Sequence, residues 1–496
     1  MWHRVPRPED GRVTEIIAGL YMSPLELLVL PGAVALVVAR WLPPAARPRA
    51  TIAAGALLVL SATVLSVAGI RWQMLPVLAG AAVALPSALS PLLRRRTGRT
   101  ARRARWWLAL PGSVACVGLI ATGPVAAWAF PVPVFPEPSG RFAVGTRVVQ
   151  WTDPHRPETA TADPHDRRTV VVQLWYPARK SPASAPRARY LGRTEHEART
   201  VSDALARHVG LPGFLVDGVP RARTRSVFNA PVAGGSGRFP VVLFSPGLGG
   251  VRTQNTAWAE ELASHGYVVA ALDHPYDSAA VVLADGRTIN ARVASTGDPD
   301  KDEKLGAGWA TVRAADLSFV LTQLGRLDRG EIAGPLTGRL DTGRAAVTGH
   351  SIGGGSALQA ARRDRRFDAV IDLDGYPYDP TSRSLHQPAL ALTQAITPDT
   401  DPHYLPRLTK VLELNTVTSY RLTIPGAAHL TFMDGPLYLP PVPSVVGSLG
   451  RTESPHVVAA TTLAFLDSTL RHKPGDLATV LSAYGDLSVH PPGSSR

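Results

Sequence analysis

Three long apolar runs without a charged residue stand close together in the first 130 residues of this 496-residue chain. They cover residues 51–70, 72–93 and 106–130. A helix of about 20 residues crosses the ~30 Å hydrocarbon core of a bilayer, so each run is long enough to span a membrane. A fourth run, residues 20–39, contains Glu26 near one end. The pattern predicts an all-α transmembrane region of about four helices in residues 1–130.

A buried helical bundle and a cleaved signal peptide are the alternatives for these runs. Soluble proteins rarely place three such runs so close together. A signal peptide has one short apolar core followed by soluble sequence, whereas here further apolar runs follow the first. Membrane insertion is therefore the favoured interpretation.

The basic charge of the chain is concentrated in the same region. The whole chain carries a net charge of +13, and residues 1–130 contribute +10 of it, from fourteen arginines, no lysine and four acidic residues. Counted in chain order, with residues 20–39 as the first run, seven of these arginines lie between the third and fourth runs and three between the first and second. The turn between the second and third runs has Arg71 alone.

Short arginine-rich loops stay in the cytoplasm. The arginine distribution therefore predicts a multi-pass protein of the cell membrane, with residues 1–19 and everything after Phe130 on the extracytoplasmic side. Nucleic acid is the alternative partner for the arginine cluster at residues 94–105. Interleaved aromatic residues and a recognisable nucleic-acid-binding module are missing from that part of the sequence, so no nucleic-acid partner is expected.

A proline-rich linker, residues 131–140, separates the apolar runs from a segment with a different pattern. Prolines cannot continue a helix, and they make this linker stiff and extended. Short β-branched runs then alternate with helical stretches at residues 254–265 and 309–324. The runs lie at residues 169–176, 241–244, 267–272, 345–348 and 369–373.

This alternation predicts a mostly parallel sheet flanked by helices, an α/β domain over residues 141–496. Residues 179–237 and 291–305 have the composition of insertions into that domain. A single cysteine, Cys116, excludes an intramolecular disulfide framework and a cysteine-rich zinc module.

The strongest chemical signal is the G-x-S-x-G motif at residues 349–353, Gly-His-Ser-Ile-Gly. It directly follows the apolar strand at residues 345–348 and precedes a helix-compatible stretch. A strand, a tight turn and a helix are the context in which such a serine acts as a nucleophile, and the two glycines leave room for the turn. Ser351 is the candidate nucleophile, against the alternative of an ordinary glycine turn. His350 is expected to face away and to pack.

A glycine-rich turn that could bind an oxyanion follows an earlier strand. Residues 239–244 read as a buried strand and run into Ser-Pro-Gly-Leu-Gly-Gly at residues 245–250. The backbone amides of Leu248 and Ile352 are the natural donor pair for the developing negative charge. A phosphate-binding turn is a weak alternative, because neither a G-x-G-x-x-G nor a Walker pattern is present there.

The acidic partner of a nucleophilic serine is expected at the end of a later strand. Asp374 stands at the carboxyl end of the strand at residues 367–373, where active-site loops gather in open α/β sheets. Asp372 lies deeper in the strand and is expected to be structural. Asp399 and Asp401, after the next apolar run, remain alternatives because the acid can follow either strand.

The general base must be a histidine that follows the acid. The histidines after Ser351 are His386, His403, His429, His456, His472 and His490. His429 alone sits just past an apolar run, residues 420–424, on a turn of small residues. It is the favoured base.

Several motifs together resemble the platelet-activating-factor acetylhydrolase branch of the α/β-hydrolases. They are GHSIGGG at residues 349–355, FSPGLGG at 244–250, DLDG at 372–375, GAAHLTFMD at 426–434, LWYPA at 174–178, ALDHPYD at 271–277 and the Arg313-Ala-Ala-Asp316 helix. The likeness covers roughly residues 140–470. It implies an α/β-hydrolase fold, with Ser351 as nucleophile, Asp374 as acid and His429 as base.

The resemblance also implies that the Leu248 and Ile352 amides form the oxyanion hole. The acid of that branch stands about 23 residues after the serine, as Asp374 does after Ser351. This sequence departs from the branch at Pro246, where a histidine is frequent, and in its apolar N-terminal region. The GHSIGGG motif is also similar to cutinase-type polyester hydrolases, which widens the class of substrates.

The sequence thus predicts a membrane-anchored serine ester hydrolase that acts on a small-molecule or lipid ester through an acyl-enzyme. No cofactor and no metal are expected, because neighbouring pairs such as Asp273 and His274 lack ligand spacing. The oligomeric state is not predicted. A membrane-tethered binding module with an inactive hydrolase fold is one alternative. A transporter with an accessory domain is another, weakened because the spans lack internal charges.

Overall fold

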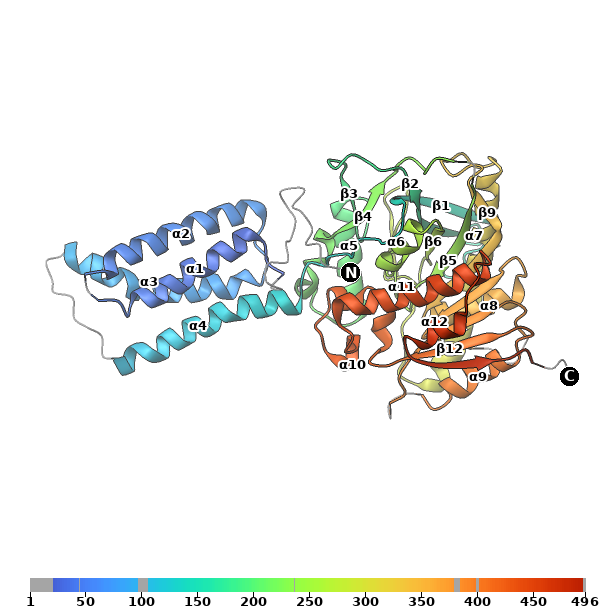
Figure 1. Ribbon diagram of the computed structural model, residues 1–496. Helices are drawn as coiled ribbons and strands as arrows, with labels where there is room; N and C mark the ends of the chain where they lie inside the picture. The colour runs from blue at the N-terminus through green and yellow to red at the C-terminus, as the bar shows by residue number, and fades with distance from the viewer. Residues whose placement is uncertain are drawn as a thin grey trace. The chain divides into compact units, whose positions relative to one another are not determined.

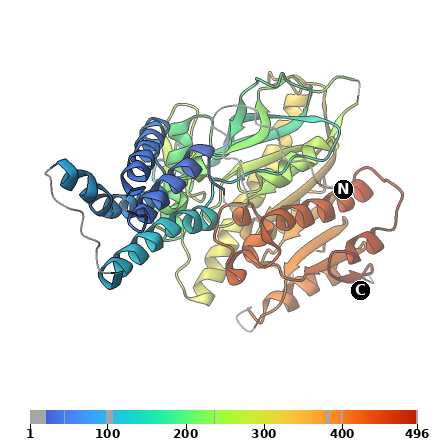
Figure 2. The same cartoon turned by 60° about the vertical axis from the view of Figure 1, so that its left-hand side comes forward.

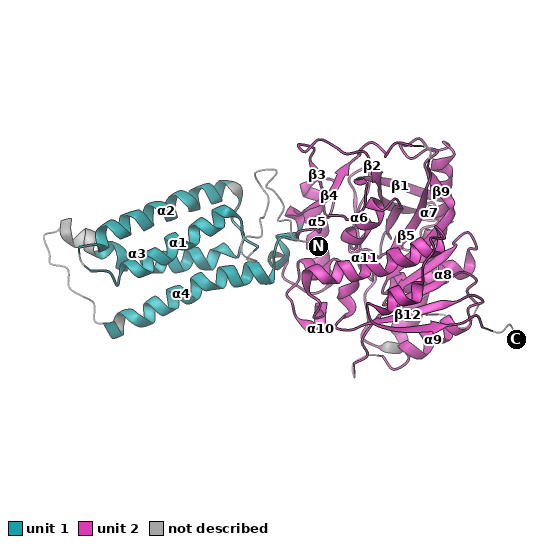
Figure 3. Ribbon diagram, viewed as in Figure 1, with its two compact units in different colours: residues 1–133, 214–219 teal, residues 134–213, 220–496 magenta. Residues whose placement is uncertain are grey.

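The computed structural model describes residues 21–43, 45–96, 106–235, 237–378, 384–397 and 401–493. The chain divides into two compact units, which Figure 3 shows in different colours. The first comprises residues 1–133 and 214–219, and the second residues 134–213 and 220–496. Each unit has a hydrophobic core of its own.

The first unit contains the helices α1 (Pro24–Ala39), α2 (Arg47–Ala68), α3 (Met74–Arg96) and α4 (Trp106–Ala129), labelled in Figure 1. Among the described residues, two helical stretches are long and apolar enough to cross a membrane, Arg47–Val67 and Ala109–Ala129. The apolar parts of the other two helices are shorter, Pro24–Ala39 and Met74–Ser90. The sequence predicted about four spans; the structure has helices at all four places, but two of them reach spanning length.

The first predicted span, residues 20–39, begins later in the structure, at Pro24, and ends where predicted. Ser23 caps α1 by accepting a hydrogen bond from the Glu26 amide, and the helix ends at Ala39, directly before Arg40. Sixteen residues rise about 24 Å at 1.5 Å per residue, which is less than the ~30 Å hydrocarbon core. Residues 1–20 and 97–105, which carry the expected external N-terminus and part of the arginine cluster, lie outside the described residues.

Glu26, the charge inside the first apolar run, is buried and paired. Its carboxylate accepts hydrogen bonds from Arg71 Nε at 2.7 Å and Arg71 Nη2 at 2.8 Å. It also accepts from the Ser23 amide at 2.8 Å. A charge at a helix start that is paired in this way does not prevent the rest of the helix from being apolar.

An eleven-stranded sheet forms the centre of the second unit. Its strand order is β13-β12-β11-β10-β9-β5-β6-β2-β1-β4-β3. The strands are β1 (Ala143–Pro157), β2 (Arg167–Ala178), β3 (Arg187–Arg189), β4 (Arg223–Phe228), β5 (Phe239–Ser245), β6 (Val268–Asp273), β9 (Leu340–His350), β10 (Ala369–Leu373), β11 (Ala389–Gln394), β12 (Ser419–Ile424) and β13 (Asp486–His490).

The central part of this sheet is parallel, as predicted. Neighbouring strands from β6 through β5, β9, β10 and β11 to β12 pair in parallel. Antiparallel strands extend both edges, because β2 pairs with β6 and β1, and β13 pairs with β12. The long strand β1 and the terminal strand β13 had no counterpart in the sequence prediction. A separate two-stranded sheet is formed by β7 (Ala280–Val282) and β8 (Thr288–Asn290).

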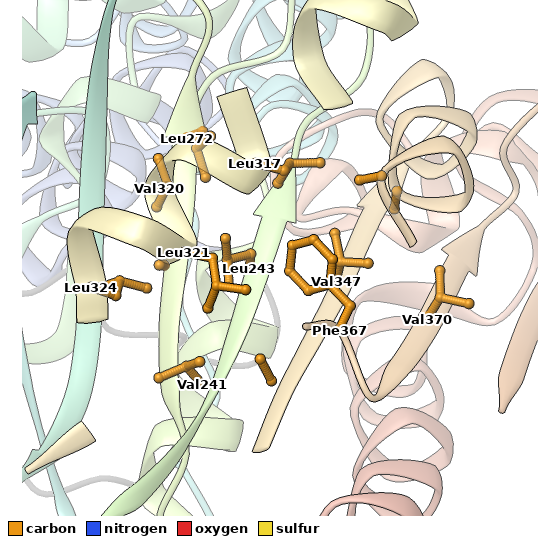
Figure 4. Packing of buried hydrophobic residues seen from close by; sticks show 14 of the residues in the cluster. Val241, Leu243, Leu272, Leu317, Val320, Leu321, Leu324, Val347, Phe367 and Val370 are labelled. Carbon is orange, nitrogen blue, oxygen red and sulfur yellow. The ribbon is translucent and has the colours of Figure 1, made fainter. Parts of the chain in front are cut away.

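Helices cover both faces of the sheet. One core packs the strands against α7 (Pro299–Asp328), α8 (Ile352–Arg363) and α9 (Tyr404–Glu413); Figure 4 shows part of it, with Val241 and Leu243 facing the leucines of α7. The other core contains Val242 and Phe244, which point to the opposite face, against α6 (Thr256–Ser264), α11 (Gly450–Thr469) and α12 (Leu477–Ser482). Figures 1 and 2 show α11, in red, lying along the sheet. Alternate side chains of a strand point to opposite faces, so a run of apolar residues fills both cores.

The two predicted insertions contain regular structure. Residues 179–237 hold β3, β4, α5 (Glu195–His208) and the 3-10 helices η1 (Gly213–Val216) and η2 (Val219–Arg221). Helix α7 begins at Pro299 instead of the predicted residue 309, because Asp298 caps it by accepting a hydrogen bond from the Lys301 amide at 3.3 Å. The polar residues 299–305 are therefore the first turns of a long helix.

The second half of the proline-rich linker packs on the second unit. Phe135 is 1% exposed, and its ring lies 4.9 Å from that of Tyr190. Glu137 forms an ion pair with Arg225 at 2.6 Å. The Phe135 side chain thus holds this segment against the second unit, whereas the prolines predicted an extended spacer.

Candidate active site

The parallel strands bring their carboxyl ends to one edge of the sheet. In the register of the sheet, Ser245 of β5 lies beside Gly349 of β9, and His350 lies beside Leu373 of β10. The turns that follow these three strands therefore lie next to one another. They are the turns that carry the predicted oxyanion donors, the serine and the acid.

Ser351 occupies a strained turn between β9 and α8. Its backbone has φ 57° and ψ −125°, a positive φ that residues other than glycine rarely adopt. The Ser351 amide donates to the Leu373 carbonyl at 3.0 Å, and the Ser351 carbonyl accepts from the Gly354 amide at 2.9 Å. These bonds hold the turn, and the side chain of Ser351 is partly exposed.

The glycines on either side of the serine allow the backbone to pack closely. A Cβ atom on Gly353 would lie 2.0 Å from the Ser245 carbonyl oxygen and 2.5 Å from that of Pro246. A Cβ atom on Gly349 would lie 2.3 Å from the Gly353 carbonyl. The G-x-S-x-G spacing is thus required by backbone contacts between the serine turn and the strand β5.

We expect the substitution Gly353→Ala to destabilise the second unit by about 3 kcal/mol or more, because overpacking against rigid backbone cannot be relieved by a rotamer change. The thermal unfolding midpoint of the full-length protein measures this. Gly308→Ala is the matched control, since Gly308 lies in α7 with open space around it. That change is expected to be neutral or to stabilise by up to about 1 kcal/mol. Equal midpoints for the two variants would contradict the steric argument.

Asp374 and His429 form a hydrogen-bonded pair. His429 Nδ1 lies 2.6 Å from Asp374 Oδ2. Asp374 also accepts hydrogen bonds from the Gln394 amide at 3.1 Å, Gln394 Nε2 at 3.0 Å and the Tyr404 hydroxyl at 3.2 Å. Four donors around one carboxylate fix its orientation, and the carboxylate in turn fixes the His429 ring. The other ring nitrogen of His429, Nε2, stays available, and the side chain is 42% exposed.

Of the other candidate acids, the structure describes Asp372 and Asp401, and neither is hydrogen-bonded to a described histidine ring. Asp401 accepts a hydrogen bond from the His403 amide at 2.8 Å, and Asp399 lies outside the described residues. Asp372 is fully buried, and burial followed by the nearby charge of Asp374 raises its pKa well above the ordinary value. Among the described histidines, His429 is the one hydrogen-bonded to Asp374.

Two backbone amides at this edge of the sheet are free to bind a ligand. Leu248 follows the end of β5, and Ile352 is the first residue of α8. Neither amide donates a hydrogen bond within the part of the chain that the structure describes. An unpartnered N–H at the start of a helix, where the helix dipole is positive, favours negative charge.

His350 does more than pack, which was its predicted role. It is 2% exposed, and its ring lies 4.6 Å from that of His429. Its Nε2 lies 2.9 Å from the His429 carbonyl oxygen, which can only accept, so Nε2 carries the proton. Its Nδ1 lies 2.9 Å from Gln254 Nε2 and accepts from it. Burial, and secondly the charge of His429, lowers the pKa of His350 to about 3.

This depressed pKa predicts a pH dependence of stability. A histidine that is neutral in the folded state and has an ordinary pKa near 6.5 when unfolded stabilises the fold fully above that pH. As the pH falls from 6.5 towards 3, the stabilisation is lost by up to about 1.4 kcal/mol per pH unit. We expect His350→Phe to show a weaker fall of the unfolding midpoint between pH 6.5 and 4 than the wild type. Parallel curves for the two proteins would contradict the assignment.

The segment that carries His429 is attached to the start of α6. His429 begins the 3-10 helix η3 (His429–Phe432), which η4 (Gly435–Leu437) follows. Between them, Asp434 accepts hydrogen bonds from the Thr256 amide at 2.7 Å and the Ala257 amide at 3.2 Å. The Phe432 carbonyl accepts from Asn255 at 2.7 Å. Asp434 thus caps α6 from another part of the chain and fixes the position of the histidine.

Sequence reasoning missed several of these supporting residues. No sequence motif marks Gln254, Gln394 or Tyr404, because each is distant in the sequence from the group it binds. Asp434 did lie within the quoted motif around His429, and Arg313 and Asp316 share one helix face at a spacing of three residues. That spacing was the available signal for a buried ion-pair cluster.

No group of three or more histidine, cysteine or acidic side chains among the described residues is arranged to hold a metal.

A mostly parallel sheet covered by helices on both faces, with a serine on a strained strand-to-helix turn beside a histidine–aspartate pair, defines a protein of the α/β-hydrolase class. Residues 129–476 match the family model "Platelet-activating factor acetylhydrolase, isoform II". The chain belongs to this family.

Individual relatives agree with this membership. The chain is similar to the platelet-activating factor acetylhydrolase of Cavia porcellus, with 30% identity over 176 residues, 32% of this chain and 39% of that protein. It is similar to the cutinase est1 of Thermobifida alba, with 25% identity over 269 residues, 52% of this chain and 71% of that protein. Among solved structures, a ferulic acid esterase from Streptomyces cinnamoneus superposes with a TM-score of 0.57 and 31% identity, covering 72% of this chain and 98% of that one. The chain thus spans well under half of the mammalian relative and nearly all of the solved esterase.

Proposed function

We propose that this protein is a serine hydrolase of carboxylic esters, with Ser351 as nucleophile, His429 as general base and Asp374 as the acid that orients it. The 2.6 Å hydrogen bond between Asp374 and His429 Nδ1, at the sheet edge that also carries Ser351, is the observation that supports this proposal most directly. It fixes the tautomer in which His429 Nε2 is free to accept a proton.

The reaction proceeds by an acyl-enzyme. His429 Nε2 takes the proton of the Ser351 hydroxyl as Oγ attacks the ester carbonyl carbon, and the carbonyl oxygen becomes an oxyanion. The Leu248 and Ile352 amides donate to this oxyanion. When the tetrahedral intermediate collapses, the bond to the alcohol breaks and His429 gives the leaving oxygen its proton. Water, deprotonated by the same histidine, then releases the acid and restores Ser351.

Membership of the family supports a proposal for the substrate class. We propose a lipid ester with a short acyl chain, of the kind named in platelet-activating factor acetylhydrolase. Polyester hydrolysis is the second candidate, favoured by the likeness to the cutinase over more than half of this chain. A 2-acetyl phospholipid, a long-chain triglyceride and a polyester film form the panel that separates these candidates.

Labelling with a fluorophosphonate tests the mechanism. The probe reacts with activated serines, and peptide mass spectrometry is expected to find it on Ser351. Absence of labelling in folded protein would favour the alternative of a non-catalytic binding module. A label found on a different serine would assign the nucleophile to that serine instead of Ser351.

We further propose that the first unit holds the protein in the cell membrane by about four helices, with the catalytic domain extracytoplasmic. Large apolar side chains on the outside of the helices support this, among them Leu60 at 67% exposure, Val67 at 88% and Val114 at 62%. The distribution of arginines between the apolar runs supports the orientation. A C-terminal alkaline phosphatase fusion is expected to be active and a green fluorescent protein fusion dark; the reverse result would overturn the orientation.

A further inference from the structure

A fully buried arginine lies directly behind the turn that carries Leu248. Arg313 of α7 is 0% exposed. Its Nη1 donates to the Pro246 carbonyl, and its Nη2 donates to the Gly247 carbonyl at 3.0 Å. Asp277 holds the other edge of the guanidinium, with Nε to Oδ2 at 2.6 Å and Nη2 to Oδ1 at 2.5 Å. One side chain thus binds two consecutive carbonyls of the turn.

These contacts decide where the Leu248 amide points. The Gly247 carbonyl and the Leu248 N–H belong to one trans peptide plane, in which the two groups point in opposite directions. Because Arg313 binds the carbonyl from inside the domain, the N–H faces away from Arg313. The preceding peptide plane is held from both sides, by Arg313 at the Pro246 carbonyl and by Gln254 Oε1 at the Gly247 amide, 3.1 Å away.

A second Ser–His–Asp arrangement supports the arginine. Ser245 Oγ lies 2.9 Å from His274 Nε2, and His274 Nδ1 lies 2.8 Å from Asp316 Oδ2. All three residues are 0% exposed, so no substrate reaches this serine. Burial lowers the pKa of His274, and although burial opposes ionisation of Asp316, Arg168 holds the pKa of that carboxyl far below its ordinary value.

The protonation of this arrangement follows. The Asp316 carboxylate can only accept, so the neutral His274 carries its proton on Nδ1 and accepts on Nε2. The Ser245 hydroxyl therefore donates to His274 and keeps a lone pair for Arg313 Nη1, 3.3 Å away. Asp277 on one side and Ser245 on the other thus fix the guanidinium in its plane.

We propose that Arg313 is a positioning residue that aims the Leu248 amide at the oxyanion, with Asp277 and the Ser245–His274–Asp316 group fixing the guanidinium. This rests on the proposed function, because the oxyanion exists only if Ser351 attacks an ester. Arginine is required because its planar fork reaches two carbonyls and a carboxylate at once, whereas a lysine ammonium is a single point of charge.

The test uses the full-length protein with the substitutions Arg313→Lys and Asp277→Asn. We measure kcat and KM for a p-nitrophenyl ester, together with inhibition by a trifluoromethyl ketone that forms a hemiketal oxyanion on the serine. Removing an oxyanion donor costs about 10²–10³-fold in kcat, so we expect kcat of Arg313→Lys to fall by about 10²-fold with KM changed less than about threefold. Inhibition by the ketone is expected to weaken by a similar factor.

Arg471→Lys is the matched control for a general loss of stability. Arg471 likewise donates to two consecutive carbonyls, those of His265 at 2.9 Å and Gly266 at 2.6 Å, and pairs with Asp467 at 3.3 Å, but these groups lie before β6 and not at the Leu248 turn. We expect this variant to lower the unfolding midpoint while kcat and ketone inhibition, measured below that midpoint, stay within about threefold of wild type.

The outcomes separate the two proposals. A folded wild type that neither hydrolyses esters nor reacts with fluorophosphonate refutes the proposed function. An active wild type whose kcat and ketone inhibition survive Arg313→Lys refutes the positioning role, and so does an equal loss in Arg471→Lys. If Arg313→Lys does not fold, Asp277→Asn decides by the same criterion, with an expected loss of about 10-fold in both quantities, because the guanidinium stays but is no longer held on that side.

Discussion

The substitution Ser351→Ala is expected to lower kcat for a p-nitrophenyl ester by at least about 10⁴-fold, because removing a member of a serine triad leaves only oxyanion and binding contributions. The unfolding midpoint is expected to change little, since the Ser351 side chain is partly exposed and the turn is held by backbone hydrogen bonds. Single-turnover hydrolysis and fluorophosphonate labelling of the variant measure the loss.

Ser356→Ala is the matched control for this substitution. Ser356 lies in the same helix α8, and its hydroxyl donates to the Ile352 carbonyl at 2.6 Å without contacting the His429–Asp374 pair. Its removal costs one internal hydrogen bond, about 1 kcal/mol of stability, and is expected to leave the reaction with Ser351 intact. Turnover of Ser351→Ala at the wild-type rate would refute Ser351 as the nucleophile.

The substitution Asp374→Asn is expected to lower kcat by about 10³–10⁴-fold, because a neutral amide no longer holds the His429 tautomer in which Nε2 accepts the serine proton. The carboxylate now accepts four hydrogen bonds, one of them from Gln394 Nε2. The amide nitrogen of asparagine would face one of these donors instead of accepting from it. The pH dependence of kcat/KM is the second measurement, since its acid limb reports the base of the free enzyme.

Asp401→Asn is the control that decides between the two candidate acids. Asp401 is exposed, and its carboxylate accepts from the His403 amide next to α9. Activity within about twofold of wild type is expected, as for most surface substitutions away from a site. A large loss in Asp401→Asn together with an active Asp374→Asn would assign the acid to the later loop.

Residue order alone placed the main groups of the candidate site. Ser351, Asp374 and the Leu248 turn each directly follow a run of apolar residues, and such runs become neighbouring parallel strands whose carboxyl ends share one edge. Close backbone packing at the serine turn requires glycine at positions 349 and 353. This requirement leaves a fixed glycine spacing in the sequence, and the motif can be identified from that spacing without a structure. Local periodicity likewise predicted the central strands and the apolar helices of the first unit.

The tertiary structure decided which groups hold these residues in place. His350 binds the His429 carbonyl, Asp434 caps a helix far away along the chain, and Arg313 turns the Gly247–Leu248 peptide. Such contacts join residues tens to hundreds of positions apart, and their donors and acceptors leave no periodic trace in the sequence. By contrast, the starts of α1 and α7 depend on neighbouring residues, the caps Ser23 and Asp298.

The apolar pattern and the glycine spacing of this chain thus predicted its class of fold and singled out Ser351, Asp374 and His429 as candidates. Only the tertiary structure showed that Asp374 and His429 are hydrogen-bonded to each other, that a second Ser–His–Asp group is buried, and that Arg313 binds the carbonyls of the Leu248 turn. The physical reason is that hydrophobic periodicity is a property of neighbouring residues, whereas burial and hydrogen-bond geometry exist only once distant segments have packed.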